Sequence, residues 1–133
     1  MRVLFLDTVH PILEKQLVVA GFKCEHDIAS SYNAIVAKIE KYDGIVIRSR
    51  IPMNEQLLAA GKNLKFIARS GAGLENIDLE AAANNGISVF SSPEGNRDAV
   101  GEQAIGMLLM LFNHLKRADA EVRKGVWLRE EIH

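Results

Sequence analysis

The chain has 133 residues, 48% of them hydrophobic and 25% charged, which is typical of a folded globular protein and excludes a disordered one. Its formal net charge of −1 gives no indication of a nucleic-acid-binding surface, and its one cysteine, Cys24, excludes an internal disulfide or a cysteine metal cluster. No apolar run approaches the roughly 18 residues that a membrane span needs, so we expect a cytoplasmic protein without a nucleic-acid or membrane partner.

Short apolar runs alternate with helical spacings through the first two thirds of the chain. The predicted strands are residues 3–6, 22–28, 44–48, 64–68 and 87–90. The predicted helices are residues 12–18, 31–42, 54–60 and 78–85, and glycines follow three of them. Strands that alternate with helices through short turns favour an α/β fold. We predict a flavodoxin-like, doubly wound parallel sheet of five strands in the order 2-1-3-4-5.

The last third of the chain predicts one long helix over about residues 98–124. Apolar residues lie on opposite sides of this helix, so more than one side should be buried. The helix is either a central core helix or a helix that docks on another domain or subunit. We favour docking, because one covering layer on a five-stranded sheet does not need so much apolar surface.

Two polar segments follow predicted strands, at the edge where parallel α/β sheets bind ligands. The first is Arg48-Ser49-Arg50, whose guanidinium groups could bind a carboxylate or phosphate, although ordinary surface ion pairing explains them equally well. The second is Arg69-Ser70-Gly71-Ala72-Gly73, whose amides could line an anion site or simply make a tight turn. It is not a dinucleotide fingerprint, because Asn76 stands in the place of the third glycine.

Other polar residues indicate no chemistry of their own. Asn96 and Asp98 are candidate caps for the long helix, and Glu102 suits its first turns. The four histidines have no evident partners, so we expect neither a catalytic residue nor a metal site within this chain.

The second half of the chain resembles the substrate domain of the D-2-hydroxyacid dehydrogenases. The resemblance lies in the run FIARSGAGLENIDLEAAANNGISVFSSPEGNRDAVGEQAIGMLLML. It contains the family's R-x-G-x-G-x-[DE]-N-[IV]-D turn, a glycine-ended helix and strand, P-x-x-N, and an A-x-E helix start. The strand end VIRSR is similar to that of the phosphoglycerate-oxidising members.

This resemblance implies an organisation for the chain. Residues 1–97 would be the substrate-binding lobe, and residues 98–125 the helix that leads to a Rossmann cofactor domain outside this chain. That domain would hold the catalytic Arg, the acid–base His and the GxGxxG fingerprint. The residues that the resemblance implies for the substrate are Arg48, Ser49, Arg50, Arg69, Gly71, Ala72, Gly73 and Asn96. Ala72, a threonine or valine in many relatives, and Val100 would approach the nicotinamide of NAD.

The function implied is hydride transfer between NAD and C2 of a small anionic 2-hydroxyacid or 2-oxoacid, with 3-phosphoglycerate, a substrate of serine biosynthesis, favoured by the basic residues. The isolated chain is expected to be inactive, and to form a homo-oligomer through the long helix. The alternative is a stand-alone flavodoxin-like anion-binding or signalling module. A receiver domain, however, needs an aspartate where the third strand ends in Arg48-Ser49-Arg50.

Overall fold

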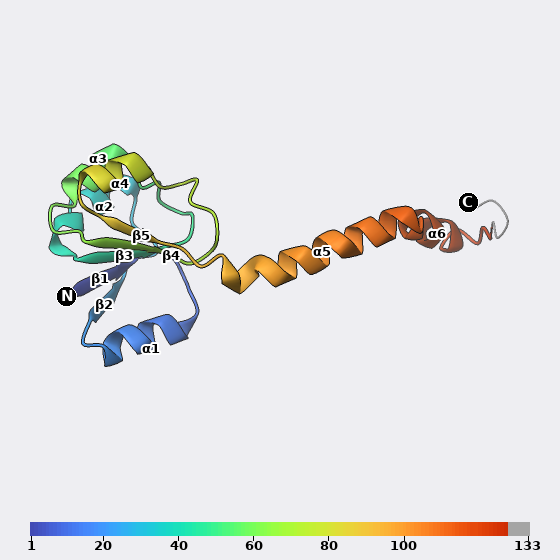
Figure 1. Cartoon of the computed structure of the whole chain (residues 1–133), viewed down its shortest axis with the longest axis horizontal. Helices are drawn as coiled ribbons and strands as arrows, with labels where there is room; N and C mark the ends of the chain where they lie inside the picture. The colour runs from blue at the N-terminus through green and yellow to red at the C-terminus, as the bar shows by residue number, and fades with distance from the viewer. Residues whose placement is uncertain (128–133) are drawn as a thin grey trace. The chain divides into compact units, whose positions relative to one another are not determined.

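A computed structural model describes residues 1–127 of the chain. The chain divides into two compact units, Met1–Gly95 and Asn96–His133. The first unit is a sheet with helices on both faces, and the described part of the second is mostly helical (Figure 1).

The first unit is built on one parallel sheet of five strands in the order β2-β1-β3-β4-β5. Its strands are β1 Arg2–Phe5, β2 Lys23–His26, β3 Gly44–Ile47, β4 Phe66–Arg69 and β5 Ser88–Phe90. The predicted fold class and strand order are confirmed. Buried, apolar stretches such as GIVI in β3 form central strands because both of their faces are covered.

The helices of the first unit follow the predicted order, with one correction. They are α1 Pro11–Val19, α2 Tyr32–Val36, η1 Ile39–Lys41, α3 Glu55–Ala60 and α4 Leu79–Asn84. The single helix predicted up to Tyr42 is wrong, because it divides into α2 and the 3₁₀ turn η1. The division falls at Lys38, which leaves the helical conformation and pairs its ammonium group with the carboxylate of Asp27.

The two faces of the sheet carry separate apolar clusters. Leu4, Ile45 and Ile67 belong to the larger one, which packs beneath α2, η1, α3 and α4. The smaller cluster is Val3, Phe5 and Val46, and partly buried residues of α1 such as Leu13 and Leu17 pack against it. Neighbouring residues of one strand thus serve opposite faces, as the pleat requires. The sheet is therefore doubly wound, as predicted.

The second unit departs from the predicted single long helix. Instead, α5 spans Glu94–Phe112 and α6 spans Leu115–Val122. Between them His114 adopts a left-handed backbone conformation with φ of 51°, which ends α5. The Leu109 carbonyl accepts both the backbone amide of Asn113, at 3.0 Å, and its side-chain amide, at 2.9 Å, near the end of the helix.

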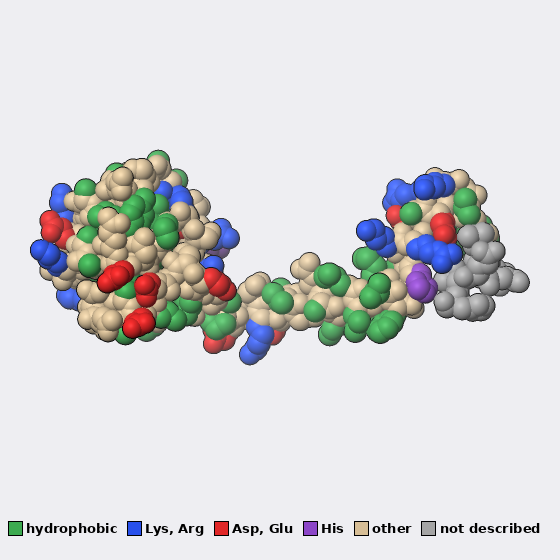
Figure 2. Space-filling view, turned by 90° about the horizontal axis from the view of Figure 1, so that it is seen from above, with side chains coloured by type: hydrophobic (Ala, Val, Ile, Leu, Met, Phe, Trp, Pro, Cys, Tyr) green, Lys and Arg blue, Asp and Glu red, His purple; other side chains and the backbone are tan. Residues whose placement is uncertain are grey.

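The apolar character predicted for this segment is present on the surface of α5. None of its residues is buried, and large apolar side chains lie along it (Figure 2). The more exposed of these are Ile105, Met107, Leu111 and Phe112. Despite this, no helix within residues 1–127 is long and apolar enough to cross a membrane.

Candidate anion-binding site

The carboxyl ends of β3 and β4 meet at one edge of the sheet. Ile47 pairs with Arg69 in the parallel register, and the Ser70 amide donates to the Ile47 carbonyl at 2.8 Å. The loops that follow are also linked, because Met53 bridges to Ile77. The segment Arg48-Ser49-Arg50 and the glycine turn therefore lie side by side, as the edge rule for α/β sheets predicts.

The backbone of Arg48 is held by hydrogen bonds, whereas its side chain has no partner within residues 1–127. Its amide donates to Oδ2 of Asp7 at 2.6 Å, and its carbonyl accepts from Nδ2 of Asn76 at 3.3 Å. The side chain is exposed and has no hydrogen-bond or ion-pair partner within residues 1–127. Ser49 is likewise exposed, and its hydroxyl has no partner in that range. Both side chains are therefore available to a ligand.

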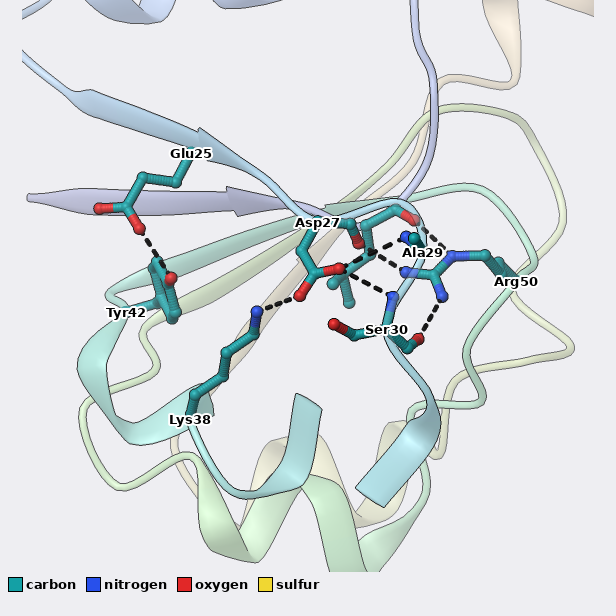
Figure 3. Close-up of polar contacts among 8 residues, drawn as sticks. Glu25, Asp27, Ala29, Ser30, Lys38, Tyr42 and Arg50 are labelled. Atoms are coloured by element: carbon teal, nitrogen blue, oxygen red, sulfur yellow. Dashed lines mark hydrogen bonds and ion pairs between the residues drawn. The ribbon is translucent and has the colours of Figure 1, made fainter. Parts of the chain in front are cut away.

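Arg50 is engaged with the protein itself. Its guanidinium donates to the carbonyls of Leu6, Asp27 and Ser30, each at 2.7 Å (Figure 3). These bonds join the end of β1 to the loop between β2 and α2. The Arg50 guanidinium, which we predicted to bind the substrate, thus donates to three backbone carbonyls instead. We assign Arg50 a structural role and leave it out of the proposed site.

Asp27 braces the same loop. Its carboxylate accepts from the Ser30 amide at 2.9 Å and the Ala29 amide at 3.4 Å, and pairs with the Lys38 ammonium (Figure 3). Lys38, followed by the Ser30 hydroxyl and amide, holds the pKa of Asp27 far below its usual value. Sequence reasoning missed this cluster, although Asp27 followed by Ser30 is a spacing typical of an aspartate-capped turn.

Arg69 lies against the glycine turn. A Cβ on Gly71 would come within 1.6 Å of Nη1 of Arg69, so the guanidinium occupies the space beside the Gly71 Cα. Nη1 donates to the Ser70 carbonyl at 3.3 Å, whereas Nε is buried without a hydrogen-bond partner in the described part of the chain. A buried donor without a partner is rare in folded proteins, which makes Arg69 a candidate for a role beyond packing.

The turn itself presents unused amides. Within residues 1–127 the amides of Ala72 and Gly73 donate no hydrogen bond, which leaves them free for an anion. A Cβ on Gly73 would lie 2.2 Å from a carboxylate oxygen of Glu75, so this exposed side chain covers Gly73. No sequence pattern predicts that contact, and an anion bound at Gly73 must displace Glu75.

A cavity of about 330 Å³ opens beside Arg69 at this edge of the sheet. Its lining includes His10, Leu13, Ser70 and Ser92. His10 caps α1 there, since its Nδ1 accepts from the Ile12 amide at 3.2 Å. The cavity thus combines a cation with the positive end of a nine-residue helix, which favours a negatively charged ligand.

The remaining predicted residues lie in the second unit. Asn96 and Val100 are exposed residues in the first turns of α5. Their contacts with substrate and nicotinamide stay predictions. The described residues contain no group of three His, Cys, Asp or Glu side chains that could hold a metal ion. What the first unit offers is a set of free amides and cations at one edge of the sheet, a chemistry that suits an anion.

A family model described as the catalytic domain of the D-isomer specific 2-hydroxyacid dehydrogenases matches residues 3–127. D-3-phosphoglycerate dehydrogenase of Archaeoglobus fulgidus is 35% identical over 112 residues, which are 84% of this chain and 21% of that protein. Only about a fifth of the relative's length is therefore represented here.

Two solved structures extend the comparison. A protein from Pyrococcus horikoshii aligns with a TM-score of 0.87 and 26% identity, over 97% of this chain and 38% of its own. NAD⁺-bound 3-phosphoglycerate dehydrogenase from Entamoeba histolytica aligns with a TM-score of 0.69 and 28% identity, over 85% of this chain and 39% of its own. The chain thus spans about two fifths of each solved relative.

Proposed function

The chain belongs to the D-isomer specific 2-hydroxyacid dehydrogenase family, and on that premise we propose that it supplies the substrate-binding lobe of an NAD-dependent enzyme for 3-phosphoglycerate. The observation that carries the substrate assignment is Arg48, whose backbone is held on both sides while its guanidinium has no partner within residues 1–127. An unpaired cation held in this way suits a phosphate.

The proposed site has two ends. Arg69 and the free amides of Ala72 and Gly73 would hold the carboxylate, since all are hydrogen-bond donors at one turn. Arg48 and Ser49, on the neighbouring loop, would hold the phosphate. Two anion sites on loops that are linked to each other would fix both ends of a three-carbon acid and so orient its C2.

NAD would be bound mainly outside the residues described. The turn after β4 lacks the third glycine of a dinucleotide site, and α4 has only six residues, so a pyrophosphate does not fit here. Ala72, with its free amide, suits an edge contact with the nicotinamide, and Val100 would add an apolar one. When bound, NAD would accept the hydride from C2. The NAD⁺-bound Entamoeba relative supports NAD as the cofactor.

The proposal gives two segments of the chain different tasks. Residues 1–97 would hold the substrate, and residues 98–125 would connect them to a cofactor-binding domain. The residues described here bind and orient, so we expect the 133-residue chain to be inactive by itself. The measurement is NADH oxidation with a panel of 2-oxoacids, and turnover by the purified chain would contradict the proposal.

Calorimetric titration with 3-phosphoglycerate, beside unphosphorylated glycerate, tests the substrate assignment. We expect saturable binding that depends on the phosphate, weakens with salt, and falls about tenfold in Arg48→Ala as a charge-assisted contact is lost. Lys41→Ala is the control, because Lys41 is an exposed cation at the amino edge of β3. Absence of binding, or equal losses in both variants, would withdraw 3-phosphoglycerate while leaving the family in place.

We also propose that the chain forms a homo-oligomer through α5 and α6. Large apolar side chains of α5 are exposed over its last turns, an arrangement that is rare on monomers. Beside them, a cavity of about 520 Å³ is lined by Met107, Met110, Leu111 and Ala120, among others. A second copy of this segment could fill it with apolar side chains.

A further inference from the structure

Asp7 and Asn76 hold the main chain of Arg48 from opposite sides. Oδ2 of Asp7 accepts the Arg48 amide at 2.6 Å, and Nδ2 of Asn76 donates to the Arg48 carbonyl at 3.3 Å. The same Asp7 oxygen accepts the Arg50 amide at 3.4 Å. Both polar groups of the Arg48 backbone are therefore bound by side chains from two other loops.

The two side chains are themselves held in place. Asp7 follows the fully buried Leu6, whose amide donates to the Val46 carbonyl at 2.9 Å. The Asn76 carbonyl accepts the Met53 amide at 2.8 Å, which links its turn to the loop after Arg48. Each contact thus comes from a segment that is fixed to the sheet or to its neighbouring loop.

Asp7 also leaves the guanidinium of Arg48 free. An aspartate next to an arginine usually forms an ion pair, but Oδ2 of Asp7 is turned to the backbone amides of Arg48 and Arg50. Within residues 1–127 no ion pair joins Asp7 to either arginine. The Asp7 carboxylate therefore fixes the loop and leaves the Arg48 guanidinium free for the phosphate of the proposed substrate.

We propose that Asp7 and Asn76 are positioning residues that set Arg48 for the phosphate of the substrate. Neither needs to touch the ligand, because each acts through the Arg48 main chain. Fixing that main chain removes part of the entropy that Arg48 would otherwise lose on binding. This inference rests on the proposed function and adds to it a structural basis for recognition of the phosphate end.

The test is the ratio of the dissociation constants for glycerate and 3-phosphoglycerate, measured by calorimetry on the 133-residue chain. Asp7→Ala should reduce this ratio about three- to tenfold, which is the cost of ordering one long side chain. Asp7→Asn keeps an oxygen acceptor for the Arg48 amide and should retain most of the ratio. Asn76→Leu has a similar size and no charge but no donor for the Arg48 carbonyl, and should reduce the ratio even if Asp7→Ala does not fold.

Asp43→Ala is the matched control. Oδ2 of Asp43 accepts the Arg2 amide at 2.8 Å and Oδ1 pairs with Lys65, so the variant loses the same kind of amide bond, together with an ion pair, at the opposite end of β3. It should lower stability without changing the ratio. Adding Asp7→Ala to Arg48→Ala should have no further effect on the ratio, because the positioned group is already absent.

The outcomes separate this inference from the proposed function. Phosphate-dependent binding that needs Arg48 but is unchanged in Asp7→Ala and Asn76→Leu overturns the positioning role alone. Equal losses in Asp7→Ala and Asp43→Ala also overturn it, because they reveal a general loss of stability. A wild-type chain that prefers neither ligand overturns both the substrate assignment and the inference built on it.

Discussion

Arg69 and Gly71 share a space that only a glycine leaves open. A Cβ atom on residue 71 would come within 1.6 Å of Nη1 of Arg69. Gly71 also has a φ of +149°, a backbone conformation that side chains rarely adopt. The glycine therefore serves both the turn and the placement of the cation beside it.

Gly71→Ala should damage the fold and the site together. The added methyl group forces a strained backbone and displaces Arg69, so we expect a loss of about 1–3 kcal/mol in the free energy of unfolding. We also expect weaker binding of 3-phosphoglycerate by calorimetry. Gly86→Ala is the control, because Gly86 has a φ of +69° but open space around it. An unchanged affinity in Gly71→Ala would contradict the role given to Arg69.

Arg50→Met should destabilise the first unit. The substitution removes three hydrogen bonds to backbone carbonyls and keeps much of the apolar length of the side chain. We expect the free energy of unfolding, measured with urea, to fall by about 2–4 kcal/mol. Arg48→Ala should change it by less than about 0.5 kcal/mol, since that side chain is exposed. Similar losses in the two variants would contradict the distinction between these arginines.

The sheet was predictable from the sequence because its central strands are short apolar runs that are buried on both faces. GIVI in β3 is apolar throughout and is covered on both faces, and the helices between strands end near the glycines that predicted their ends. The glycine turn could also be placed at the edge of the sheet. These features depend on local patterns, which a single sequence displays directly.

The remaining features depend on contacts between distant residues. Arg48 and Arg50 look alike in the sequence, and only the position of three carbonyls shows that Arg50 serves the fold. The helix after Ser31 divides at Lys38, whose ammonium group pairs with Asp27, eleven positions earlier. His114 ends α5 within an apolar pattern that favours a continuous helix, and histidine is a weak signal for a left-handed residue.

The stability of the first unit should fall in acid partly through Asp27. Its pKa in the folded chain is far below its usual value because of Lys38 and Ser30. A carboxyl group with a depressed folded pKa stabilises the fold fully above its unfolded pKa of about 3.9, and this contribution disappears as the pH falls toward the folded pKa. Unfolding by urea between pH 7 and pH 2 should show this decline.

Asp27→Asn provides the comparison for that measurement. The amide keeps an acceptor for the Ser30 amide but cannot form the ion pair with Lys38. The variant should be less stable than the wild type at neutral pH, and its stability should fall less steeply below about pH 4. Glu25 and Asp43 also have lowered pKa values, so part of the slope should remain. Identical slopes in the two proteins would exclude a contribution from Asp27.

Leu111→Lys should weaken self-association of the chain. Leu111 is 70% exposed near the end of α5 and lines the cavity of the second unit, so a charge there would be buried in the proposed interface. By sedimentation velocity we expect the wild type to associate, and the variant to need about tenfold more protein for the same degree of association. Val19→Lys is the control, because Val19 is 89% exposed on α1 of the first unit. A wild type that stays monomeric at every concentration, or an equal effect of both lysines, would show that α5 is not the interface.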